Sequence, residues 1–118
     1  MIKLAIVGTG GMAHGHAQSY QNIEGVQIVG ACDIDKERVK AFANKYNIEN
    51  TYNSFDDLLE LCEFDAISNA TPDPFHKEIA LKAINQNKHV FSEKPLAENY
   101  PDAKEMYDAT KGTNLINM

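Results

Sequence analysis

Residues 3–13 read KLAIVGTGGMA, a short apolar run that leads directly into a glycine-rich segment ending on Ala13. A helical stretch follows to about Tyr20, and a second apolar run, Val26 to Cys32, ends on Asp33. A strand, a glycine-rich turn, a helix and a second strand with a terminal acid, in this order, are typical of a dinucleotide-binding unit. The sequence therefore predicts that residues 1–33 bind NAD or NADP.

Each small residue of this unit has a physical task. Gly8 allows the tight turn off the strand, because it adopts backbone angles that a side chain forbids. Gly10 lacks a Cβ, so a pyrophosphate can approach the backbone closely, and Ala13 is small enough for the helix to pack against the strand. The helix then directs its free N–H groups and positive dipole end toward the phosphates.

Asp33 carries the prediction of which dinucleotide binds. Its carboxylate can accept hydrogen bonds from the adenosine ribose hydroxyls and repels a 2′-phosphate, which favours NAD. Lys36 and Arg38 lie close enough in sequence to offset that repulsion, so NADP remains open. Asp33 could instead cap the next helix, but Asp35 is better placed for that task.

Composition narrows the class of protein. The chain has 118 residues and a net charge of −6, which argues against a nucleic-acid partner or an anionic membrane surface. Cys32 and Cys62 are isolated and suit a reducing compartment, where both would act as apolar fillers. The first apolar run breaks at Gly8, too early for a signal peptide, so we expect a soluble, cytoplasmic protein.

Strand-like and helix-like segments alternate along the rest of the chain, which predicts a doubly wound parallel α/β sheet with helices on both faces, a Rossmann fold. We expect about six strands, including short ones at 51–52, 66–70 and 89–92 and a last run at 114–118. Helices should begin after Asp35, after Ser54 and at Asp73-Pro74. Another should cover residues 101–111, with its inward side made of Ala103, Met106, Tyr107 and Thr110.

The predicted sheet fills the whole chain with one cofactor-binding domain, residues 1–118. Almost nothing remains to close over the nicotinamide side of a bound dinucleotide. We therefore expect the chain to be the cofactor half of a longer enzyme, with the substrate-binding half absent and the isolated domain inactive.

Further polar segments fall at the carboxyl ends of predicted strands, where a cofactor would lie. They are residues 70–76, Lys88-His89-Val90 and residues 92–96, and the last contains Glu93-Lys94-Pro95. Lys94, held by a stiff Lys-Pro bond near the nicotinamide, could donate a proton to a substrate oxygen. The alternative is a solvated lysine at a strand end.

These motifs together resemble the Gfo/Idh/MocA family of NAD(P)-dependent oxidoreductases. The resemblance rests on residues 5–13, on Ala70-Thr71-Pro72 with His76, and on residues 89–96, and it spans essentially the whole chain. It implies a dehydrogenase or reductase that transfers hydride between nicotinamide and a sugar, inositol or similar polyol or ketone. It also implies a second α/β domain that forms most of the substrate pocket and usually the homo-oligomer interface.

The resemblance implies particular roles for residues of this chain. Lys94 matches the family's catalytic lysine, and Thr71-Pro72 matches a loop along the cofactor. Asn69 departs from the family, which usually has an apolar residue there, and Asp73 replaces a common Asn. The expected cofactor-binding residues are Gly8, Thr9, Gly10, Gly11, Met12, Ala13, Asp33, Thr71, Pro72, Glu93, Lys94 and Pro95.

Two alternatives concern function and metal binding. A sensor or scaffold module could bind NAD(P) without catalysis, although such a protein needs no positioned lysine at the hydride face. His14 and His16 are two residues apart on a helix and do not share a face, so they make a poor metal pair. We expect packing roles for both and no metal site.

Overall fold

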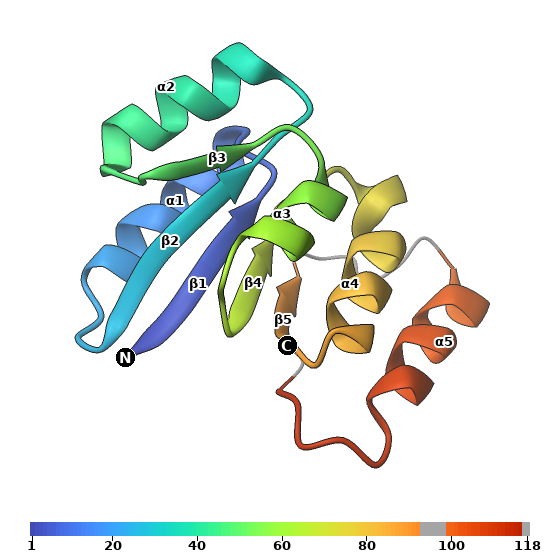
Figure 1. The fold of residues 1–118 in the computed structure, drawn as a ribbon. Helices are drawn as coiled ribbons and strands as arrows, with labels where there is room; N and C mark the ends of the chain where they lie inside the picture. Colours follow the sequence, from blue (N-terminus) through green and yellow to red (C-terminus); the bar gives the residue numbers. More distant parts are fainter. Residues whose placement is uncertain (93–98, 117–118) are drawn as a thin grey trace.

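The computed structural model describes residues 1–92 and 99–116, which build a parallel sheet between two layers of helices (Figure 1). The strands follow the order β3-β2-β1-β4-β5, the order of a Rossmann fold. Their bounds are β1 Ile2–Val7, β2 Val26–Cys32, β3 Asn50–Tyr52, β4 Ala66–Asn69 and β5 His89–Ser92. The helices are α1 Gly11–Gln21, α2 Lys36–Tyr46, α3 Phe55–Leu61, α4 His76–Asn85 and α5 Tyr100–Thr110, with a short 3-10 helix, η1, at Asp73–Phe75.

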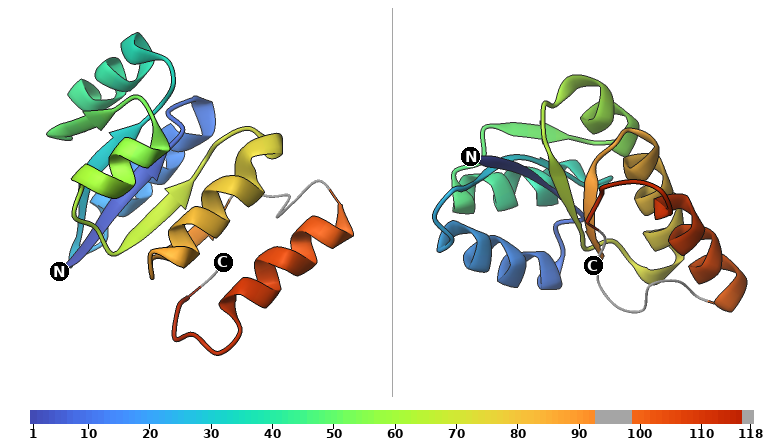
Figure 2. Two further views of the ribbon diagram at one scale, coloured as in Figure 1. Left: turned by 45° about the vertical axis from the view of Figure 1, so that its right-hand side comes forward. Right: turned by 90° about the horizontal axis from the view of Figure 1, so that it is seen from below.

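Helices α1 and α2 cover one face of the sheet, and α3, α4 and α5 lie on the other (Figure 2). Each face has its own apolar core. Ile6 and Ala31 pack with residues of α1 and α2, while Val7 and Ile67 pack with residues of α3, α4 and α5. Burial on both faces explains why the central strands read as nearly continuous apolar runs. Among the described helices, none is long and apolar enough to cross a membrane.

The helix starts follow the predicted capping chemistry. The Asp35 carboxylate accepts a hydrogen bond from the Arg38 amide at 3.1 Å at the start of α2, and the Ser54 hydroxyl accepts one from the Asp57 amide at 3.1 Å at the start of α3. Both side chains satisfy backbone donors that have no partner within the helix. The predicted caps at Asp35 and Ser54 are therefore confirmed.

Four details differ from the prediction. Lys88-His89-Val90, expected at the carboxyl end of a strand, lie at the amino end of β5. The described part of the sheet has five strands; residues 114–116 are not a strand, although the Val90 amide donates to the Ile116 carbonyl at 3.0 Å beside β5. Helix α4 starts at His76 because η1 covers Asp73–Phe75 first. Tyr107 is 60 % exposed, and only Met106 of α5 is fully buried. Helix α5 therefore packs through a narrower stripe than its apolar pattern predicts.

The strand register brings the site together. Val7 lies opposite Cys32 on one side and Asn69 on the other. The segments that follow these three residues therefore leave the sheet at one edge, on both sides of β1. Since the chain runs outward in opposite directions from β1, this edge is the crevice where doubly wound sheets bind ligands.

Candidate functional site

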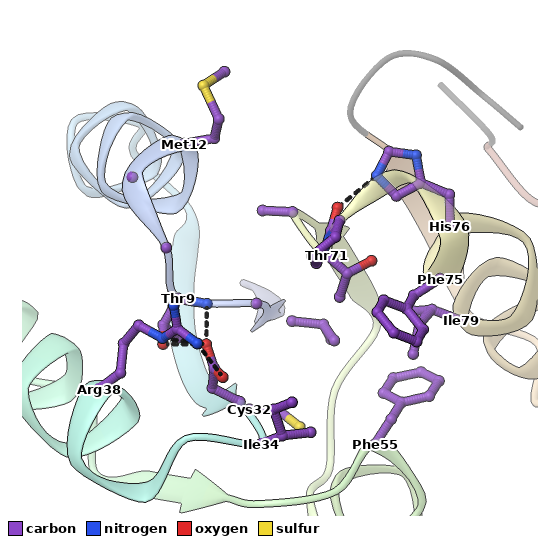
Figure 3. Close-up of a pocket in the computed structure, with 17 residues that line it drawn as sticks. Thr9, Met12, Cys32, Ile34, Arg38, Phe55, Thr71, Phe75, His76 and Ile79 are labelled. Atoms are coloured by element: carbon purple, nitrogen blue, oxygen red, sulfur yellow. Dashed lines mark hydrogen bonds and ion pairs between the residues drawn. The ribbon is translucent and has the colours of Figure 1, made fainter. Parts of the chain in front are cut away.

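A cavity of about 680 Å³ opens at this edge of the sheet (Figure 3). That volume falls in the usual range for small-molecule and cofactor sites. Its walls come from the ends of β1, β2 and β4 and from the start of the helices that follow them. The lining residues are Val7, Gly8, Thr9, Gly10, Gly11, Met12, Cys32, Asp33, Ile34, Arg38, Phe55, Ala70, Thr71, Pro72, Phe75, His76 and Ile79.

Gly8 makes the turn from β1 toward α1 with a φ of +88°. Its amide donates to the Cys32 carbonyl at 2.8 Å, and a Cβ at this position would lie 2.7 Å from the carbonyl oxygen of Ala70. Both the backbone angle and the close approach of the β4 loop exclude a side chain. The structure thus shows the turn that the sequence predicts at Gly8.

The first turn of α1 faces the cavity with bare backbone. A Cβ on Gly10 or Gly11 would meet nothing within 4 Å, and no side chain caps the helix at Gly10. Amide N–H groups at an uncapped helix start, together with the helix dipole, form an anion-binding site. Space that a side chain would fill is thus left open where a pyrophosphate can bind. The residues fit a dinucleotide.

Asp33, at the end of β2, is held from several directions. One carboxylate oxygen, Oδ2, accepts the Thr9 amide at 2.9 Å and the Thr9 hydroxyl at 2.7 Å. The other, Oδ1, accepts the Asp35 amide at 3.0 Å. The Arg38 guanidinium approaches both oxygens, with Nε 3.2 Å from Oδ2 and Nη2 3.4 Å from Oδ1. The side chain is 7 % exposed, so a charged group is buried here among donors.

These partners set the protonation state of Asp33. Burial alone would raise the pKa of the carboxyl, but the amides of Asp35 and Thr9, the Thr9 hydroxyl and the Arg38 charge outweigh it. The pKa of Asp33 is therefore lowered from its ordinary value. The group is a carboxylate at neutral pH, as acceptance of hydrogen bonds from a ribose requires.

Asn69 shapes the opposite wall of the cavity. Its Oδ1 accepts the Thr71 hydroxyl at 2.6 Å, and its Nδ2 donates to the His76 carbonyl at 3.2 Å. The His76 ring in turn donates from Nε2 to the Thr71 carbonyl at 2.7 Å. Asn69 and His76 are fully buried. They brace the Thr71-Pro72 loop, which explains a polar residue at this buried position of β4.

The floor and outer rim of the cavity are apolar. Cys32, Phe55 and Ile79 are buried, whereas Phe75 is partly exposed and Ile34 is 85 % exposed at the mouth (Figure 3). Burial, with the nearby Asp33 and Asp57 charges, raises the pKa of the Cys32 thiol to about 12. Cys32 therefore acts as an apolar filler, as predicted. An apolar wall suits a heteroaromatic ring such as adenine.

Most of the sequence-predicted site residues meet at this one cavity. Residues 8–12, Asp33, Thr71 and Pro72 line it, and Ala13 is fully buried just behind, against the core. Glu93, Lys94 and Pro95 lie outside the described residues. His76 belongs to the segment 70–76 that the sequence placed beside the cofactor, and Asn69 was noted as an unusual polar residue in a buried strand. Neither their contacts with Thr71 nor the apolar wall was predicted.

The first-helix histidines pack against neighbouring elements. His14 Nδ1 lies 2.7 Å from the Tyr46 hydroxyl of α2, and His16 Nδ1 lies 2.7 Å from the Ser68 hydroxyl of β4. The two rings thus have different partners on different elements, which confirms their packing roles. Within residues 1–92 and 99–116, no group of three His, Cys, Asp or Glu side chains is arranged to hold a metal ion.

The fold and the cavity define a dinucleotide-binding Rossmann domain, and comparison with known proteins identifies its family. Residues 2–118 match the family model described as "Oxidoreductase family, NAD-binding Rossmann fold". The chain is 33 % identical over 118 residues to scyllo-inositol 2-dehydrogenase (NADP(+)) of Bacillus subtilis, covering 100 % of this chain and 36 % of the relative. It is 34 % identical over 110 residues to inositol 2-dehydrogenase of Salmonella typhimurium, covering 92 % and 33 %.

A solved structure agrees. Scyllo-inositol dehydrogenase from Lactobacillus casei, with bound NAD(H) and scyllo-inositol, superposes with a TM-score of 0.94 at 26 % identity, over 100 % of this chain and 35 % of that one. This chain therefore belongs to the Gfo/Idh/MocA oxidoreductases and is an NAD-binding Rossmann domain of that family. It spans about a third of the length of the relatives it matches. Each of these three relatives is named as a dehydrogenase.

Proposed function

We propose that this chain is the cofactor-binding domain of an NAD-dependent dehydrogenase that acts on a sugar, an inositol or a similar polyol or its ketone. One observation carries the proposal: the uncapped start of α1 and the buried, ionised Asp33 line the same cavity. The first would bind the pyrophosphate of a dinucleotide, and the second would bind its adenosine ribose. The inositol dehydrogenases among the relatives support the substrate class.

The residues divide the cofactor between them. Backbone amides at Gly10, Gly11 and Met12 would hold the pyrophosphate, and Asp33 would accept the adenosine ribose hydroxyls. Thr71 and Pro72 would cover the cofactor from the β4 side. When bound, the nicotinamide supplies the hydride acceptor and donor. The chain itself binds and orients the dinucleotide and covers one face of it.

Lys94 is proposed as the residue that exchanges a proton with the substrate oxygen during hydride transfer. It follows β5, whose carboxyl end lies at the same edge of the sheet as the cavity. In the full-length protein, Lys94→Ala should abolish turnover and leave NAD affinity nearly unchanged. Lys111→Ala, on an exposed lysine after α5, is the matched control and should retain turnover. Undiminished turnover of Lys94→Ala would remove Lys94 from the mechanism.

NAD is proposed as the preferred cofactor because the Asp33 carboxylate repels a 2′-phosphate. Calorimetric titration of the chain with NAD and with NADP tests this preference. We expect the lower dissociation constant for NAD. Tighter binding of NADP would contradict the proposal.

We propose that a part of the protein outside residues 1–118 supplies the rest of the activity. The relatives are about three times as long as this chain, and we place most of the substrate pocket and a homo-oligomer interface in a second domain. The isolated chain should then bind cofactor weakly and turn over no substrate. The isolated cysteines and the negative net charge support a cytoplasmic location without nucleic-acid partners.

A further inference from the structure

Asp33 is surrounded by five donors in this structure. Thr9 supplies an amide at 2.9 Å and a hydroxyl at 2.7 Å, and Asp35 supplies an amide at 3.0 Å. Arg38 supplies Nε at 3.2 Å and Nη2 at 3.4 Å. A carboxylate offers about four lone-pair positions on its two oxygens. Every position that a ribose hydroxyl could use is therefore already taken.

The five donors differ in how easily they can leave. The Thr9 and Asp35 amides are fixed by the backbone of the glycine-rich turn and of the α2 start, and the Thr9 side chain is buried. The Arg38 side chain is 49 % exposed, contacts Asp33 and lines the cavity. It lies beside Thr9 (Figure 3). It stands on the first turn of α2 and can rotate into solvent without disturbing the core. Arg38 is the donor that a ligand can displace.

We propose that Arg38 closes the ribose position in the free protein and moves off Asp33 when NAD binds. This inference rests on the proposed function, since it takes Asp33 as the ribose acceptor. The hydroxyls of the ribose replace the guanidinium as donors, so the carboxylate stays satisfied in both states. NAD must break the Asp33–Arg38 ion pair in order to bind, so the presence of this ion pair lowers the apparent affinity for NAD.

The same movement bears on the choice between NAD and NADP. A guanidinium binds a phosphate with two parallel hydrogen bonds. The 2′-phosphate of NADP would therefore retain Arg38 as a partner, whereas NAD releases it to water. Arg38 thus weakens NAD binding and supports NADP binding. It therefore reduces the preference for NAD over NADP that the Asp33 charge creates.

The test uses ADP-ribose and 2′-phospho-ADP-ribose as probes, because they carry the discriminating ribose without the nicotinamide. Arg38→Met keeps an unbranched apolar side chain and removes the guanidinium. We expect it to bind ADP-ribose about two- to fivefold more tightly than the unmodified chain, the range of a partly exposed ion pair. It should bind 2′-phospho-ADP-ribose more weakly.

Lys36→Met is the matched control. It removes one positive charge from the same turn of α2 and leaves the five contacts to Asp33 in place. Because both probes are anions, loss of a nearby cation by itself weakens binding, so this variant should not gain affinity for ADP-ribose. If only Arg38→Met gains affinity for ADP-ribose, the gain results from loss of the Asp33–Arg38 ion pair and not from the change in net charge near the site.

A second measurement needs no variant. The Nε–H signal of Arg38 in a nitrogen-resolved NMR spectrum should move on addition of ADP-ribose and exchange faster with water. Unchanged or weaker ADP-ribose binding by Arg38→Met, or an unmoved Arg38 signal at saturation, would overturn the proposal that Arg38 closes the ribose position. Failure of both the unmodified chain and Arg38→Met to bind ADP-ribose would overturn the proposed function itself.

Discussion

Thr9 donates twice to the same oxygen of Asp33, from its amide at 2.9 Å and from its hydroxyl at 2.7 Å. This pair joins the glycine-rich turn after β1 to the end of β2. Both ends of the proposed dinucleotide site are thereby fixed to each other before any ligand binds. Such preorganisation lowers the cost of ordering the site on binding.

Thr9→Val tests the energetic weight of that contact. The change keeps the shape of the side chain and removes a buried hydroxyl that donates to a charged acceptor, so the free energy of unfolding should fall by about 1–3 kcal/mol. Thr9→Ser retains the hydroxyl and should lose less. Urea denaturation measures both variants. Equal stability of Thr9→Val and the unmodified chain would contradict this role of Thr9.

The lowered pKa of Asp33 predicts a particular pH dependence of stability. An unfolded Asp titrates near 3.9, and the folded group titrates lower. The carboxylate therefore contributes its full stabilisation above about pH 5, and that stabilisation is lost as the pH falls through the folded pKa. Asp33→Asn lacks this component. Its free energy of unfolding should fall less steeply between pH 5 and 3 in acid titrations followed by circular dichroism, and parallel curves would contradict the assignment.

The glycines of the turn should separate folding from binding. Gly8→Ala meets the carbonyl of Ala70 and requires a positive φ, so it should destabilise the fold by about 1–3 kcal/mol. Gly10→Ala meets nothing within 4 Å and has a φ of −78°. It should unfold like the unmodified chain but bind NAD more weakly, because its Cβ enters the space proposed for the pyrophosphate. Undiminished NAD affinity of Gly10→Ala would place the phosphates elsewhere.

The effects of substitutions at Asn69 and Thr71 on stability should be coupled, because their side chains share a hydrogen bond. Asn69→Leu leaves the Thr71 hydroxyl and the His76 carbonyl without this partner, at a cost of about 1–3 kcal/mol. Thr71→Val removes the hydroxyl from the other side. Denaturation of both single variants and the double variant forms a cycle, in which we expect the double to lose less than the sum. Strict additivity would show that the 2.6 Å contact contributes nothing specific.

The sequence predicted the features that depend on local order. The turn at Gly8, the acid at Asp33 and the caps at Asp35 and Ser54 follow from residue type and spacing, because one short segment determines each. The contacts of Arg38 and Asn69 were not predicted, since they depend on how side chains from separate elements meet. Tyr107 was placed inward because helical periodicity identifies an apolar stripe but not the width of the surface that it packs against.

The glycine-rich turn, Asp33 and the Thr71-Pro72 loop are proposed to form one NAD site. Backbone NMR spectra of the chain during titration with NAD test this proposal most directly. We predict saturable shifts concentrated at residues 8–12, Asp33–Arg38 and Thr71, with little change on β3 or α5. Shifts confined to other surfaces, or no shift at millimolar NAD, would contradict the account.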